Sequence, residues 1–83
     1  MHEKLTKLLL EAAEEILALP QDEMKDNFEL DLFENGLIDS LGCMSMMTYM
    51  EDALNVGINI EDLTAEDFVS LYSMREALKK LIK

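Results

Sequence analysis

The first part of the chain repeats apolar residues with a helical period. From Leu5 onward they recur every three or four positions, and glutamates occupy the other faces. The apolar positions are Leu5, Leu8, Leu9, Ala12, Ile16 and Leu19. Pro20 biases the residue before it away from the helical conformation. The pattern therefore predicts a first helix over roughly residues 3–18.

Residues 20–39 keep no sustained helical period and contain Pro20, Asn27, Asn35 and Gly36 among scattered acids. Asn35-Gly36 is a strong hairpin signal, but the apolar segments beside it are too short to be paired strands. A simple turn is the better interpretation. We expect one long ordered loop here, and a loop of this length in a small domain usually has a function.

A second helical pattern begins after Asp39 and Ser40, which are both favourable N-cap residues, and continues to about Leu54. One stripe has the spacing expected of a core face: Cys43, Met46, Met47, Met50 and Leu54. A second line, formed by Leu41, Met44 and Thr48, lies on a different face. Methionines often fill irregular cores, but a soft apolar line rimmed by acids also suits a docking surface. We therefore predict that this second line is exposed and contacts partners.

The C-terminal part predicts two further helices. Thr64 and Asp67 form a capping box for a short helix from Ala65 to about Leu71. Ser73 and Glu76 form a second box, which predicts that the last helix opens there. The expected fold is an all-α bundle of three longer helices and one short helix, with a long loop between the first two. Residues 1–83 should form one domain.

The net charge of the chain restricts the kinds of partner that it can bind. Eighteen acidic residues against seven basic ones give a net charge of −11. Such a surface repels nucleic acid and anionic lipid and attracts partners that present Lys or Arg patches. The single cysteine cannot form an internal disulfide, and no signal-peptide-like or membrane-spanning stretch is present. We expect a monomeric cytoplasmic protein that neither binds nucleic acid nor inserts into a membrane.

Few residues are candidates for catalysis or for metal binding. His2 is the only histidine, so no Ser-His or Cys-His pair can form, and His2 with Cys43 would make an incomplete zinc site. Cys43 lies on the core stripe, and we expect it to be packed rather than reactive. The acids between Asp22 and Asp39 suggest a calcium loop, but the EF-hand pattern fails because Phe28 stands where an oxygen ligand is required. Catalysis is not expected.

Ser40 is the remaining candidate. At the start of a helix, an attached phosphodiester would face free backbone N–H groups and the positive end of the helix dipole. Gly42 has no side chain to hinder the approach of such a group or of a modifying enzyme. The alternative is that the Ser40 hydroxyl simply caps the helix.

The stretch Leu32-Phe33-Glu34-Asn35-Gly36-Leu37-Ile38-Asp39-Ser40-Leu41-Gly42 closely resembles the attachment motif of the acyl and peptidyl carrier protein superfamily. The core of that motif is Asp-Ser-Leu at the head of the second helix, here Asp39, Ser40 and Leu41. The resemblance implies that a phosphopantetheinyl transferase, using magnesium that it holds itself, places 4′-phosphopantetheine from coenzyme A on Ser40. It also implies that Leu41 and Met44 lie at positions that partner enzymes touch.

A carrier of this kind is not an enzyme. By the same resemblance, the arm would hold an acyl or aminoacyl group as a thioester, loaded by an adenylating ligase or acyltransferase with a basic docking patch. Gly42 and the Glu66-Asp67-Phe68 region are most similar to D-alanine carriers of teichoic acid modification. Those carriers tend to have glutamate at the position of Ser45, which is a departure. A carrier in another pathway and an acidic interaction module without a prosthetic group are the alternatives.

Overall fold

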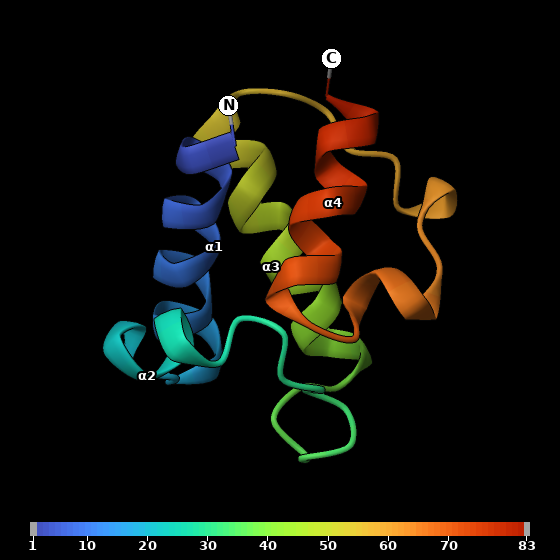
Figure 1. The fold of residues 1–83 in the computed structure, drawn as a ribbon. Helices are drawn as coiled ribbons and strands as arrows, with labels where there is room; N and C mark the ends of the chain where they lie inside the picture. The colour runs from blue at the N-terminus through green and yellow to red at the C-terminus, as the bar shows by residue number, and fades with distance from the viewer. Residues whose placement is uncertain (1, 83) are drawn as a thin grey trace.

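Three helices form the body of the protein in a computed structural model that describes residues 2–82. Helix α1 (His2–Leu17) packs against both α3 (Ser40–Leu54) and α4 (Leu71–Leu81), as Figure 1 shows. The short helix α2 (Gln21–Asp26) lies against α1, and the 3-10 helices η1 (Ile60–Asp62) and η2 (Ala65–Phe68) join α3 to α4. No strand occurs in residues 2–82. The predicted all-α bundle with three longer helices and one short helix is confirmed.

The core draws on all three long helices and on the loop before α3. Its largest fully buried side chains are Leu5, Leu9, Leu32, Met46, Met47, Met50, Leu71, Met74 and Leu78. The predicted core stripe of α3 is confirmed, because its first four members are buried and its fifth, Leu54, packs against them partly buried. Burial of this stripe fixes which face of α3 is turned to solvent.

Helix α1 ends one residue before the predicted position, and the cause is local. Ala18 takes a left-handed conformation with φ of 58°, and the Leu19 N–H donates to the Ala13 carbonyl at 3.2 Å. A left-handed residue at this point turns the chain away from the helix axis and ends the helix. Pro20 follows as the N-cap of α2, where its carbonyl accepts the Met24 N–H at 3.0 Å. Pro20 thus separates two helices rather than a helix and a loop.

The prediction that residues 20–39 form a single loop is wrong for the first third of that stretch, where α2 lies. Six residues are too few to show a helical period in sequence. Tertiary burial stabilises the helix, since Met24 is buried in the core. The acids Asp22 and Glu23 stand in the first turn and Lys25 in the last, as the helix dipole favours.

Residues 27–39 form the ordered loop that was predicted, and two backbone hydrogen bonds tie it to the C-terminal part of the chain. The Leu32 N–H donates to the Val69 carbonyl at 2.7 Å, and the Tyr72 N–H donates to the Phe28 carbonyl at 2.9 Å. The expected turn at Asn35-Gly36 is confirmed by the positive φ of Gly36. These hydrogen bonds therefore fix the position of the loop that leads into α3.

Helix α4 begins one turn earlier than the sequence predicted. Its N-cap is Ser70, whose side-chain oxygen accepts the Ser73 N–H at 3.0 Å, so Ser73 is inside the helix. Leu71 is completely buried, and this contact favours the earlier start. Glu76 therefore closes no capping box and instead pairs with Arg75 at 3.1 Å and Lys79 at 3.6 Å.

The short helix predicted after Thr64 is present but is a 3-10 helix that ends at Phe68 rather than Leu71. The predicted partner of its cap is confirmed, because the Thr64 N–H donates to the Asp67 carboxylate at 2.8 Å. Phe68 is buried and anchors this segment to the core.

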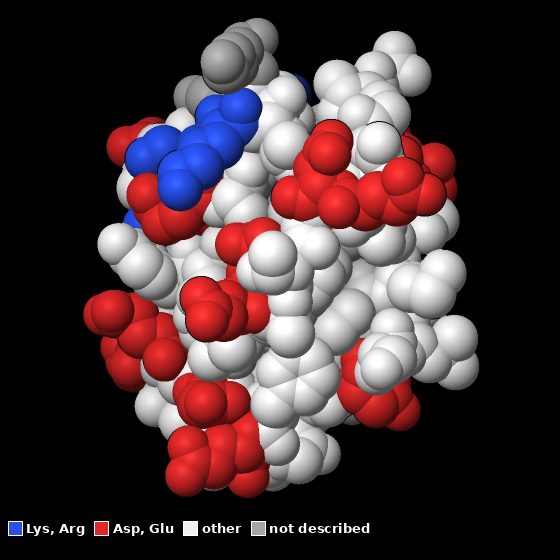
Figure 2. All heavy atoms as spheres, turned by 90° about the vertical axis from the view of Figure 1, so that its right-hand side faces the viewer, with Lys and Arg blue, Asp and Glu red and all other residues white. Residues whose placement is uncertain are grey.

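Acidic side chains are spread over the face shown in Figure 2, whereas Lys and Arg gather near the end where the chain termini lie. No helix within residues 2–82 is both long and apolar enough to cross a bilayer. On this face, the basic side chains thus form one patch, whereas the acidic side chains are spread over the rest of the surface.

Candidate functional site

The start of α3 is defined by Asp39. Its backbone is extended, its side-chain Oδ1 accepts the Gly42 N–H at 2.7 Å, and its carbonyl accepts the Cys43 N–H at 2.9 Å. Asp39 is therefore the N-cap, and Ser40 is the first residue of the helix. Of the two cap candidates in the sequence, the structure uses the aspartate, so the alternative capping role of the Ser40 hydroxyl is wrong.

Ser40 is exposed, and its hydroxyl makes no hydrogen bond with any residue in the 2–82 range. The backbone N–H groups of Ser40 and Leu41 likewise have no partner among those residues. The hydroxyl thus lies in the first turn of α3, at the positive end of the helix dipole, and the free backbone N–H groups of Ser40 and Leu41 are in the same turn. This arrangement fits a phosphodiester, which needs hydrogen-bond donors and a favourable potential.

The predicted second line of α3 is exposed, as expected. Leu41 is 73% and Met44 is 55% exposed, and Thr48 is also on the surface. Leu41 adjoins Ser40 directly, and Met44 lies one helical turn further on. A partner that approaches Ser40 would therefore meet exposed apolar surface.

Ser40 borders a groove of about 260 Å³ between α3 and the two 3-10 helices, here called the η-side groove. Its wall includes Phe33, Cys43, Met44, Leu63 and Phe68. The packing role predicted for Cys43 is confirmed by its burial. Burial raises the pKa of the Cys43 thiol, and the negative charge of Asp39 raises it further. The thiol is therefore kept in its neutral, weakly nucleophilic form at neutral pH.

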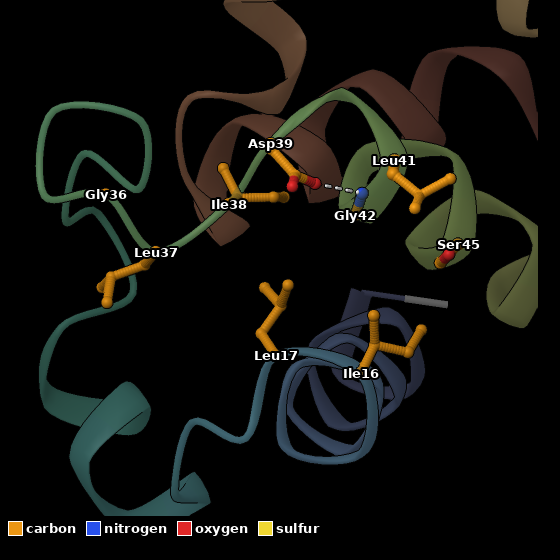
Figure 3. A pocket seen from close by; sticks show the side chains of 9 residues that line it. All are labelled: Ile16, Leu17, Gly36, Leu37, Ile38, Asp39, Leu41, Gly42 and Ser45. Carbon is orange, nitrogen blue, oxygen red and sulfur yellow. Dashed lines mark hydrogen bonds between the residues drawn. The ribbon is translucent and has the colours of Figure 1, made fainter.

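A second groove, of about 410 Å³, lies on the other flank of the α3 start and is called the α1-side groove (Figure 3). Three segments form it, with lining residues Ile16, Leu17, Leu37, Leu41, Gly42 and Ser45. Asp39 also borders it, and its bond to Gly42 is the dashed line in Figure 3. Sequence reasoning missed this groove because Ile16 and Leu17 are more than twenty residues from Ser40 along the chain.

Gly42 is closely surrounded at the base of the α1-side groove. A Cβ atom on this residue would lie 3.1 Å from Cγ1 of Ile38 and 3.3 Å from Cδ2 of Leu17. Such distances are shorter than ordinary van der Waals contact. A larger residue here would require the side chains of Ile38 and Leu17 to shift by a few tenths of an ångström, so Gly42 has a packing role in addition to the access role that we predicted.

The other sequence candidates do not join this site. His2 is exposed in the first turn of α1. Within residues 2–82, no group of three His, Cys, Asp or Glu side chains is arranged to hold a metal ion. The acids that suggested a calcium loop, between Asp22 and Asp39, are instead divided between α2, the loop and the cap of α3.

Comparison with known proteins agrees with this geometry. No solved structure gave a significant match to the chain. The family model described as "Phosphopantetheine attachment site" matches residues 7–78, which include most of α1, the loop, all of α3 and most of α4. Domains of this family are non-catalytic carriers of 4′-phosphopantetheine that are modified by phosphopantetheinyl transferases and work with partner enzymes. The chain thus belongs to the phosphopantetheine attachment family and is a carrier protein rather than an enzyme.

Proposed function

We propose that Ser40 is the residue that carries 4′-phosphopantetheine. The observation that supports this assignment is that Asp39, and not Ser40, caps the start of α3. Asp39 satisfies the helix start through the Gly42 N–H, so the exposed Ser40 hydroxyl is left free. The phosphodiester would lie at the positive end of the helix dipole, near the N–H groups of Ser40 and Leu41.

The prosthetic group, when attached, supplies the terminal thiol that holds the cargo as a thioester. The residues of the chain position and present it. Asp39 holds the first turn of α3 in place, and Leu41 offers apolar contact beside the attachment point. The acidic surface favours a partner with a basic docking patch, and the exposed line of Leu41, Met44 and Thr48 would set the fit.

Intact-mass analysis tests the assignment of Ser40. The purified chain is incubated with coenzyme A, magnesium and a broad-specificity phosphopantetheinyl transferase. We expect a mass increase of one phosphopantetheine group for the natural sequence and none for Ser40→Ala. Ser73→Ala is the matched control, because it removes a serine hydroxyl from a different helix and should be modified normally. Modification of Ser40→Ala would show that the attachment residue lies elsewhere.

We also propose that the cargo is a small acyl or aminoacyl group, loaded by an adenylating ligase, and that D-alanine for teichoic acid modification is the first candidate. Gly42 supports this view, since fatty-acid carriers usually have an acid there, and a Cβ atom at this position would require the side chains of Leu17 and Ile38 to shift by a few tenths of an ångström. Asp67 and Phe68 support it less, because the structure gives them capping and core roles.

A comparison of two loading reactions distinguishes a small cargo from a fatty-acid cargo. The modified chain is offered to a D-alanine ligase with ATP and D-alanine, and separately to an acyl ligase with ATP and fatty acids. We expect faster thioester formation with D-alanine, read by intact mass. Exclusive loading by fatty acids would reject the small-cargo proposal and would leave the Ser40 assignment intact.

A further inference from the structure

A third groove, of about 580 Å³, lies between α1, α2 and α4 and is here called the basic groove. Its wall includes Thr6, Lys7, Leu10, Gln21, Lys25 and Arg75. Among residues 2–82, it shares no lining residue with the two grooves beside the start of α3. It borders the N-terminal half of α1, whereas the α1-side groove borders the C-terminal end of that helix. A molecule in the basic groove would therefore contact a surface separate from the one next to Ser40.

The charge of the basic groove is opposite to that of the protein as a whole. Of the described residues that line it, three are among the seven bases of the chain, Lys7, Lys25 and Arg75, and one is an acid, Glu3. Neither Lys7 nor Lys25 forms an ion pair within residues 2–82, although the chain has eighteen acidic residues. The groove is thus a cationic site on an acidic protein.

Arg75 is held in a fixed position at the wall of this groove. Its side chain is only 12% exposed, and its Nε donates to Oε2 of Glu76 at 3.1 Å. Its Nη1 donates to Oγ1 of Thr6 at 3.1 Å, whereas its Nη2 has no partner within residues 2–82. The guanidinium carbon lies 5.0 Å from the centroid of the Phe28 ring and 5.2 Å from that of Tyr72, which are cation–π distances. Because these contacts already order the side chain, an anion bound by Arg75 would cost little side-chain entropy.

The lining of the groove also offers apolar contact. Leu10 lies at its wall, and the lysine side chains have long apolar stems below their charged ends. The charged ends and the guanidinium suit carboxylates, which form charge-assisted hydrogen bonds with them. An occupant that combines carboxylates with an apolar side chain would satisfy both features.

The surroundings of the groove favour a short occupant over an extended anionic surface. Glu3 lies at the wall, and Glu14 accepts a hydrogen bond from the lining residue Gln21 at 2.8 Å. A nucleic acid or an anionic membrane would extend past the groove and meet these acids, and the net charge of −11 would repel it or a second copy of the chain. We propose that the basic groove binds a short segment of a partner protein in which Asp or Glu residues flank an apolar side chain. This inference does not depend on attachment at Ser40.

An NMR titration of the full chain with a synthetic peptide tests the inference. The probe peptide has one leucine between pairs of glutamates, and a peptide with lysines in place of the glutamates is its control. Lys7→Glu combined with Lys25→Glu reverses two charges of the groove. Lys4→Glu combined with Lys80→Glu is the matched control, because it makes the same charge change at exposed positions that do not line the groove.

We expect the glutamate peptide to shift the amide signals of the groove residues, with a Kd of about 1 mM or below at low salt. Reversal of Lys7 and Lys25 should raise this Kd by about tenfold or more, and the control variant should stay within about twofold of the natural chain. The lysine peptide should leave these signals unchanged. The absence of saturable shifts at the groove, or an equal Kd for the two double variants, would overturn the inference.

Circular dichroism melting establishes that each variant is folded. Should the double reversal fail to fold, Lys7→Gln combined with Lys25→Gln removes the same two charges and should raise the Kd by about threefold or more. An unchanged Kd for that variant would reject the site. Displacement of the peptide by a DNA duplex or by phosphatidylglycerol vesicles would assign the groove to a phosphate surface and would also overturn the inference. The titration uses the unmodified chain, so its result is independent of the mass analysis that tests Ser40.

Discussion

Helix α3 uses methionine for two opposite purposes. Met46 and Met47 are 0% and 1% exposed and fill the core, whereas Met44, two residues before Met46, is 55% exposed beside Ser40. The residue type is identical, so the angular position around the helix decides the role. An unbranched, polarisable side chain suits both roles, because it fills irregular space inside and adapts to different partners outside.

The largest effect should come from the buried side of this comparison. Met47→Ala should lower the free energy of unfolding by about 2–5 kcal/mol, because it removes buried contacts and leaves a cavity. Urea denaturation followed by circular dichroism measures this loss. Met47→Leu is the control and should cost less than about 1.5 kcal/mol, since it nearly conserves volume. A loss below about 1 kcal/mol for Met47→Ala would contradict the assignment of Met47 to the core.

The second-largest effect concerns Asp39, the N-cap of α3. Asp39→Ala should lower the free energy of unfolding by about 1 kcal/mol, because the Gly42 N–H loses its acceptor. Asp39→Asn should retain most of the stability, since asparagine is an equally good N-cap. Thermal melts of the two variants provide the measurement. Equal losses for both would mean that the charge of Asp39, rather than its capping bond, supports the helix.

On the exposed side, Met44→Ala should change the free energy of unfolding by no more than about 0.5 kcal/mol. It should nevertheless weaken the binding of a loading ligase, because an apolar contact next to the attachment residue is lost. Chemical denaturation and a titration calorimetry experiment with the ligase separate the two effects. A stability loss as large as that of Met47→Ala would erase the distinction between the faces.

The smallest effect probes Cys43, a residue of the buried core stripe that also borders the η-side groove. Its alkylation should be slow at neutral pH, and the pH midpoint of the rate should lie above that of the unfolded chain, because burial and Asp39 raise the thiol pKa. Because the thiol pKa is raised in the folded protein, the Cys43 thiol contributes to the free energy of unfolding fully at a pH below the pKa of the unfolded thiol. This contribution is lost as the pH rises from that value through the pKa of the folded thiol. Asp39→Asn should move the midpoint down slightly. A midpoint below that of the unfolded chain would mark a reactive thiol.

Much of the site could be predicted because its signals are local. The helical period of α3, the exposed line of Leu41, Met44 and Thr48, and the burial of Cys43 all follow from spacing within one helix. The roles of Asp39 and Ser40 could not be separated from sequence, since both residue types cap helices well. Only the bond from the Gly42 N–H to Asp39 distinguishes them.

The two wrong predictions, for α2 and for the start of α4, share a different cause. Helix α2 was missed because its six residues show no period, and Met24 stabilises it through burial against the rest of the core. The start of α4 was placed at Ser73 because that residue opens a good local capping pattern. The complete burial of Leu71 favours the alternative start at Ser70. In both cases contacts distant in sequence outweighed a local preference.

The sequence by itself determined that the protein is helical and acidic and that a serine follows an aspartate at the head of a helix, because these features depend on neighbouring residues alone. The tertiary structure decided which of the two caps that helix, and it brought Ile16 and Leu17 to the side of α3. A groove made by three separate segments exists only when the core has packed them together. For that reason the α1-side groove could be described only from the folded chain.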